Sequence, residues 1–171
     1  MNSKRFSAPW GKLLSTFTII GATCMVLAAL TAVLSEDLPA IARVATLAGA
    51  IGVTILCALG AVRGYRIEGD KLMVERLLWE TEIDLRGLES VEHHQDLIKG
   101  SLRVGNGGFF VFSGWFWSRK LGWFRLMGND IIGRAVLLSI KGKRWMVTPS
   151  HPHTFVEELE SRISAEKAQT S

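Results

Sequence analysis

The chain has 171 residues, of which 48% are hydrophobic and 21% are charged, and its net charge at pH 7 is +4. These averages are close to those of globular proteins, which excludes a disordered or collagen-like chain. Two cysteines are too few for a disulfide framework, and no cluster of Cys and His has the spacing of a metal site. The basic pI, near 9.3, leaves nucleic acid or an anionic membrane as partner classes to be weighed.

Two long apolar stretches follow a short N-terminal segment, residues 1–12. Residues 13–34 contain no charged side chain, and residues 41–62 contain only Arg43. Because about 20 apolar residues in a helix cross the hydrocarbon core, both stretches are long enough to span a membrane. The sequence therefore predicts a transmembrane helical hairpin over 13–62. Ionisable residues are missing from the interior of both stretches, which favours an anchor over a transporter.

The charges that flank the hairpin predict its orientation. Five basic residues lie on the side of the two chain ends, against one, Arg43, beside the connecting turn: Lys4, Arg5, Lys12, Arg63 and Arg66. The positive-inside rule then places both termini, and all residues after Arg63, in the cytoplasm.

Small residues recur every four positions in the second apolar stretch, where Ala45 precedes Gly49 and Ala48 precedes Gly52. Such spacing lets helices approach closely in lipid. This transmembrane packing stripe has two interpretations at this point. It either joins the two spans to each other or forms a docking face for another membrane subunit.

The residues after the hairpin predict an antiparallel β domain over 63–166, followed by a frayed tail, 167–171. Alternating or β-branched segments bounded by turn residues indicate about seven strands, at 65–67, 71–77, 79–85, 88–94, 117–127, 135–141 and 144–148. After Pro149 and Pro152, residues 153–166 predict an amphipathic helix with an apolar stripe formed by Phe155, Val156, Leu159 and Ile163.

About seven strands and a C-terminal helix are the elements of a pleckstrin-homology barrel. At the residue level, the chain resembles the bacterial PH-like domain family of small membrane proteins over Tyr65 to Ile163. The resemblance is carried by Tyr65-Arg66-Ile67 with Leu72 and Val74, Gly105-Asn106-Gly107-Gly108, Gly114-Trp115-Phe116, Leu121-Gly122, Val147-Thr148-Pro149, Pro152 and Phe155-Val156. His151 departs from the acidic residue that is frequent in the family. The resemblance implies a binding or scaffolding fold in the bacterial inner membrane, without catalysis or cofactor.

Basic and aromatic side chains concentrate in one part of this domain. Residues 97–150 contain nine basic residues and one acidic residue, and eight of the chain's 15 aromatic residues lie between Phe109 and Phe124. Trp and Phe among basic residues are typical of membrane-interface contacts, although a small barrel also needs aromatic residues in its core. The predicted contact residues for anionic lipid or a membrane-protein partner are Arg103, Phe109, Phe110, Phe112, Trp115, Phe116, Trp117, Arg119, Lys120 and Arg125.

Other kinds of site have little support in the sequence. The adjacent His93 and His94 would point to opposite faces of a strand, so they do not predict a metal site. A membrane anchor argues against nucleic acid as a partner, and no residue constellation indicates an enzyme. We therefore expect a membrane-anchored, non-catalytic PH-like interaction module; the alternative is an accessory subunit that stabilises a larger integral membrane complex.

Overall fold

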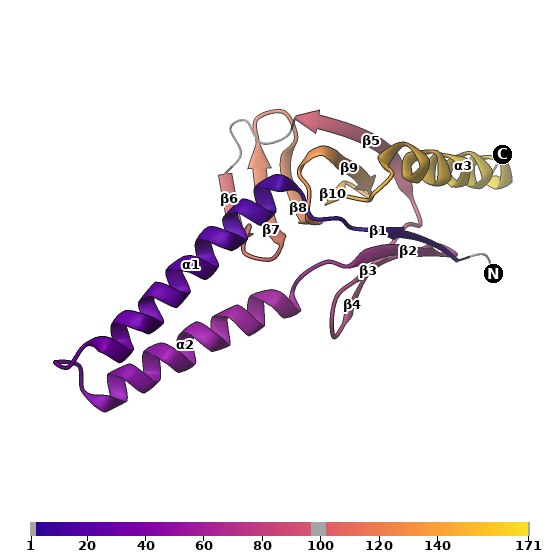
Figure 1. Cartoon of the computed structure of the whole chain (residues 1–171). Coiled ribbons are helices and arrows are strands. Elements are labelled where there is room, and N and C mark those ends of the chain that lie inside the picture. The colour runs from indigo at the N-terminus through magenta and orange to yellow at the C-terminus, as the bar shows by residue number, and fades with distance from the viewer. Residues whose placement is uncertain (1–2, 97–101, 171) are drawn as a thin grey trace.

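The computed structural model describes residues 3–96 and 102–170, which form a helical hairpin joined to a β domain with a C-terminal helix (Figure 1). The three helices are α1 (Lys12–Leu34), α2 (Ala40–Leu59) and α3 (Pro152–Thr170). The strands within the described residues are β1 (Lys4–Ser7), β2 (Gly64–Glu68), β3 (Lys71–Glu75), β4 (Glu80–Asp84), β5 (Leu88–Asp96), β6 (Leu102–Gly107), β7 (Phe112–Ser118), β8 (Gly122–Gly128), β9 (Ile132–Ile140) and β10 (Lys143–Val147).

The helical hairpin is confirmed with small shifts of its ends. The turn between α1 and α2 is held by Arg43, whose guanidinium donates to the backbone oxygens of Glu36 and Leu38, both at 3.0 Å. Arg43, the one charged residue of the second apolar stretch, therefore stabilises the turn between the two helices. α2 ends at Leu59, three residues before the predicted end.

The first sheet has the order β1-β2-β3-β4 and is antiparallel throughout. β1 precedes the hairpin in the chain and β2 follows it, yet the two pair along their length, with Phe6 opposite Tyr65. The sequence did not predict a strand in the N-terminal segment. The pairing brings both ends of the hairpin to one edge of the domain, as Figure 1 shows.

The second sheet has the order β5-β9-β10-β8-β7-β6. Its pairs are antiparallel except β8 and β10, which run parallel, so the domain is not uniformly antiparallel. The single strand predicted over 117–127 is wrong: a turn at 119–121 separates β7 from β8. Residues 112–116, which the sequence left without a predicted strand, belong to β7, and β6 was not predicted.

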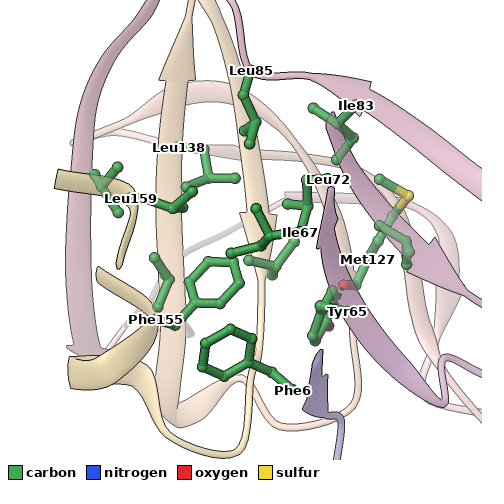
Figure 2. Close-up of a cluster of buried hydrophobic side chains, with 14 of the residues drawn as sticks. Phe6, Tyr65, Ile67, Leu72, Ile83, Leu85, Met127, Leu138, Phe155 and Leu159 are labelled. Carbon is green, nitrogen blue, oxygen red and sulfur yellow. Dashed lines mark hydrogen bonds between the residues drawn. The ribbon is translucent and has the colours of Figure 1, made fainter. Parts of the chain in front are cut away.

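The main core lies between the first sheet, part of the second sheet and α3, and Figure 2 shows its side chains. Phe155 and Leu159 of α3 are fully buried there, which confirms the predicted apolar stripe. Tyr65 crosses the core, and its hydroxyl donates to the backbone oxygen of Met127 at 2.8 Å and accepts from the backbone N–H of Thr148 at 3.0 Å. Burial raises the pKa of Tyr65 to about 12. α3 reaches Thr170, beyond the predicted end at 166.

A second core lies on the other side of β7 and β8 and joins the domain to the hairpin. Leu14, in the first turn of α1, is fully buried in it. The remaining members come from the second sheet and the loop before β9: Phe112, Phe116, Phe124, Leu126, Ile131, Ala135, Leu137 and Met146. The start of α1 is thus part of the folded domain.

Candidate functional site

Beyond their junction with the domain, both helices of the hairpin expose apolar side chains. Both are long and apolar enough to cross a membrane. The exposed large side chains run along nearly the whole hairpin and include Ile19, Ile20, Leu27, Leu30, Leu34, Ile41, Val44, Ile51, Ile55 and Leu56. Because the described domain covers only the start of α1, the rest of this apolar surface has no partner within the described chain.

One buried side chain binds both connections between the hairpin and the domain. Nδ2 of Asn129 donates to the backbone oxygen of Ala8, before α1, at 2.8 Å, and to that of Val62, after α2, at 2.6 Å. The backbone oxygen of Asn129 also accepts from the N–H of Gly11 at 3.2 Å. Asn129 is fully buried, so water does not replace these bonds. They fix the domain relative to the two helices.

The loop between β6 and β7 lies against α1, where Thr18 binds it twice. The Thr18 hydroxyl donates to the backbone oxygen of Gly108 at 3.3 Å and accepts from the N–H of Phe110 at 3.0 Å. The Phe109 ring packs so closely on α1 that a Cβ at Gly21 would lie 2.7 Å from it. Of the predicted contact residues, Phe109 and Phe110 are therefore placed beside α1.

The central aromatic residues divide between the two faces of β7 and β8. Phe112 and Phe116 are buried in the second core, so these two predicted contact residues do not reach the surface. Trp115 is 50% exposed on the opposite face and Trp117 is partly exposed; Trp123, which pairs with Trp117, is 52% exposed. Successive side chains of a strand point to opposite faces, which explains the division.

The predicted basic residues do not lie together either. Arg119 and Lys120 are exposed in the turn between β7 and β8. The β6–β7 loop that contacts α1 adjoins the other end of these strands, and six residues of strand separate the two ends by about 20 Å. Arg125 lies mid-strand, with its guanidinium carbon 5.4 Å from the Trp145 ring centroid. Arg103 is on β6, but its side chain lies outside the described residues, as does Lys99.

The loop between β3 and β4 adds surface residues that the sequence interpretation missed. Leu77, Leu78 and Trp79 are 50%, 72% and 43% exposed, and Arg76 lies over the Trp79 ring with 5.8 Å between the guanidinium carbon and the ring centroid. The predicted strands 71–77 and 79–85 include Leu77 and Trp79, and Leu78 lies between them. The signal that could have found them is a run of three large apolar residues between a strand and the acidic Glu80.

The small-residue stripe of α2 faces away from α1. Ala45, Ala48, Gly49 and Gly52 are all exposed, and a Cβ added at either glycine would meet no atom within 4 Å. The residues of α2 that approach α1 include Ala50 and Thr54, which line a shallow groove together with Ala22, Met25, Val26, Ala29, Ile51 and Ile55. The stripe therefore does not form the contact between the two helices.

The acidic face of β4 is paired within the domain. Glu80 accepts from Arg66 at 2.8 Å, and Glu82 forms an ion pair with Lys71 at 2.7 Å. Asp84 pairs with Arg86, which holds the pKa of the Asp84 carboxyl well below its usual range. These carboxylates already have cationic partners within the domain. Among the described residues, no group of three or more His, Cys, Asp or Glu side chains could hold a metal ion.

Comparison with curated proteins and with solved structures finds no match. The family model described as "Bacterial PH domain" matches residues 63–163, the segment that contains β2 to β10 and most of α3. PH domains are in general non-catalytic interaction modules that bind lipids or proteins. Because the match covers 101 of the 171 residues, together with the fold that such a domain requires, the chain belongs to the bacterial PH domain family.

Proposed function

We propose that the chain is a membrane-anchored, non-catalytic interaction module that holds its PH domain against the cytoplasmic surface of the inner membrane. The observation that carries this proposal is the attachment of the hairpin at both ends. β1 and β2 pair with each other, and Asn129 binds both connections. A domain attached in this way is confined to the membrane surface, where its effective concentration is high and weak contacts suffice.

The contact surface is the one next to the hairpin. It contains Phe109 and Phe110 beside α1, and Trp115 and Arg125 on the face of β7 and β8 opposite the second core. Trp117 lies at the far end of β7, next to the β7–β8 turn, and is not part of this surface. Indole rings and basic groups are the side chains that favour the headgroup region of an anionic leaflet. The buried Phe112 and Phe116 are not part of this surface. The proposed orientation of the hairpin, with both chain ends in the cytoplasm, rests on the excess of basic residues on the side of the chain ends.

Membrane anchoring can be tested by alkaline extraction and protease protection of the full chain. We expect the chain to stay in the membrane fraction at alkaline pH. In sealed inverted inner-membrane vesicles protease should reach the domain, whereas in right-side-out spheroplasts it should not. Release of the chain by alkali would refute the anchor, and digestion in intact spheroplasts would refute the orientation.

A second candidate function, an accessory subunit of a larger membrane complex, is favoured by one observation. The stripe of Ala45, Ala48, Gly49 and Gly52 is exposed on α2 and leaves space for a close neighbour. A photoreactive amino acid at position 115, with position 119 in the distant turn as control, separates the candidates. Cross-links to lipid support the first function, and a single protein adduct of constant mass supports the second.

A further inference from the structure

A groove of about 550 Å³ lies between β1 and the start of α3. All four residues of β1 line it on one side, and Ser150, His151 and Thr154 line it on the other, together with Arg63. In Figure 1, β1 and α3 lie on the side of the domain away from β6. Neither the membrane-facing residues proposed above nor the acidic residues of β4 line this groove.

The two sides of the groove are fixed to each other by contacts between β1 and the α3 region. The rings of Phe6 and Phe155 meet edge to face with centroids 5.0 Å apart, and both side chains are buried. The backbone N–H of Ser150 donates to the backbone oxygen of Ser7 at 2.8 Å. The groove is therefore a feature of the folded domain, with β1 held against the start of α3.

The edge of β1 that lies along the groove has backbone groups free to pair. On its other edge β1 pairs with β2, and just beyond its end the N–H of Ala8 donates to the oxygen of Arg63 at 3.2 Å. Because bonded residues alternate along an antiparallel pair, Arg5 and Ser7 direct their backbone groups away from β2. The bond from Ser150 to Ser7 agrees with this register. The N–H and oxygen of Arg5 have no backbone partner within the described chain, and such an edge can accept a further strand.

The groove is basic. Lys4, Arg5 and Arg63 line it, and no Asp or Glu of the described chain does. Outside the groove, Glu158 pairs with Lys4 at 2.7 Å. Glu75 accepts from Nε of Arg5 at 2.9 Å. Arg63 is exposed and forms no ion pair with a described residue. The first N–H groups of α3 add positive partial charge, so the groove favours an occupant that carries carboxylates.

We propose that an extended acidic segment of a partner protein binds in this groove as a further strand beside β1, an inference that deepens the interaction function proposed above and rests on it. The backbone of the segment pairs with the N–H and oxygen of Arg5. Its carboxylates lie near Arg63 and the start of α3. A second copy of the chain is a poorer occupant, because pairing β1 with itself places lysine and arginine side chains opposite like charges.

The first test measures the binding of fluorescent peptides to the full chain in a non-ionic detergent by fluorescence anisotropy. The probes are two peptides of about eight residues, longer than β1, of which one alternates Glu with Val and the other Lys with Val. We expect saturable, salt-sensitive binding of the Glu peptide and about tenfold weaker binding of the Lys peptide. Arg63→Gln should weaken binding of the Glu peptide about threefold. The matched control, Arg119→Gln, removes the same charge outside the groove and should change the affinity by less than about 1.5-fold.

A second comparison isolates the backbone pairing at Arg5. Arg5→Pro and Arg5→Ala remove the same side chain, but only proline also removes the N–H. We expect Arg5→Pro to bind the Glu peptide about tenfold more weakly than Arg5→Ala does. If Arg5→Pro fails to fold, the parent chain is tested with Glu peptides that are N-methylated at every Glu or at every Val. Because the N–H groups of a strand alternate between its two edges, one methylated peptide should bind about tenfold more weakly than the other.

The inference would be overturned by a lack of saturable binding of the Glu peptide, or by equal affinity for the two charged peptides. Equal affinity of Arg5→Pro and Arg5→Ala, or of the parent chain for the two methylated peptides, would also overturn it. A dimer of the parent chain in native mass spectrometry that Arg5→Pro alone converts to a monomer would assign the groove to a second copy instead. A chain that remains in membranes at alkaline pH but does not bind the Glu peptide contradicts only the groove. Extraction by alkali contradicts the anchor itself.

Discussion

The two faces of β7 and β8 have similar residues and opposite roles. One face, the inward face, places Phe112, Phe116 and Phe124 in the core that holds the start of α1. The other, the outward face, exposes Trp115 and Trp123, although Met127 on the same face of β8 is buried in the main core. Within one short segment, neighbouring aromatic residues thus either attach the domain to the helical hairpin or are exposed on its surface. Aromatic composition therefore identifies a membrane protein's interface only after the faces of its strands have been assigned.

The largest loss of stability is expected from a substitution on the inward face. Phe116 is buried and stacks on Phe124, with ring centroids 5.8 Å apart. Phe116→Ala leaves a cavity between the sheet and α1, so we expect the free energy of unfolding to fall by about 3–5 kcal/mol. Chemical denaturation of the full chain in detergent measures this loss. If Phe116→Ala lowered the free energy of unfolding less than Trp115→Ala does, Phe116 would not be part of the core.

The next largest loss of stability is expected at Asn129, which follows β8 and binds both connections to the hairpin. Asn129→Ala removes two hydrogen bonds and leaves the buried oxygens of Ala8 and Val62 unpaired. We expect a loss of about 3 kcal/mol and faster amide exchange in both connections, measured by hydrogen exchange with mass spectrometry. Asn129→Asp is the control, because it keeps the shape but turns oxygen toward the two carbonyls; it should not restore the parent stability.

A pH titration tests the core on the other side of β8, where Tyr65 binds the oxygen of Met127. Tyr65 is the only tyrosine in the chain, so tyrosinate absorbance reports this residue alone. Its pKa rises from the ordinary value of 10.0 to about 12 on folding. Because the unfolded chain loses the proton first, the stabilisation is present below pH 10.0 and is lost as pH rises toward 12, by roughly 2–3 kcal/mol in total.

The matching control for this titration is the unfolded chain in denaturant, which should ionise near the ordinary pKa. Ionisation of the folded chain at that same pH, without loss of structure, would contradict the burial of Tyr65. In the Tyr65→Phe variant the absorbance change should vanish, and the loss of stability at high pH should shrink.

Much of the fold could be predicted from local patterns. Twenty-two residues without charge define α1, and the stripe from Phe155 to Ile163 defines α3. β1 has only four residues, and its partner lies beyond the hairpin, so its pairing is a long-range effect that no local pattern encodes. β6 and most of β7 were missed because Gly105, Gly107 and Gly114 interrupt the apolar alternation by which strands are recognised.

The candidate site was less predictable than the fold, for a different physical reason. The abundance of basic and aromatic residues is visible in the composition, but their grouping depends on sheet order. Arg125 and Trp145 are 20 positions apart, and only the parallel pairing of β8 with β10 brings the guanidinium over the indole ring. Conversely, Arg119 and Arg125 are close in sequence, but Arg119 lies in the β7–β8 turn and Arg125 in the middle of β8.

The smallest effect on stability is expected on the outward face. Trp115 is half exposed, and Trp115→Ala should lower the free energy of unfolding by only about 1 kcal/mol, because little core contact is lost. If this face contacts lipid, the same variant should bind phosphatidylglycerol more weakly than Phe116→Ala does, when both are compared below their unfolding temperatures. The order of the two variants in lipid affinity would then be the reverse of their order in stability. The same order in both measurements would mean that lipid affinity only reports folding, and the outward face would lose its assigned role.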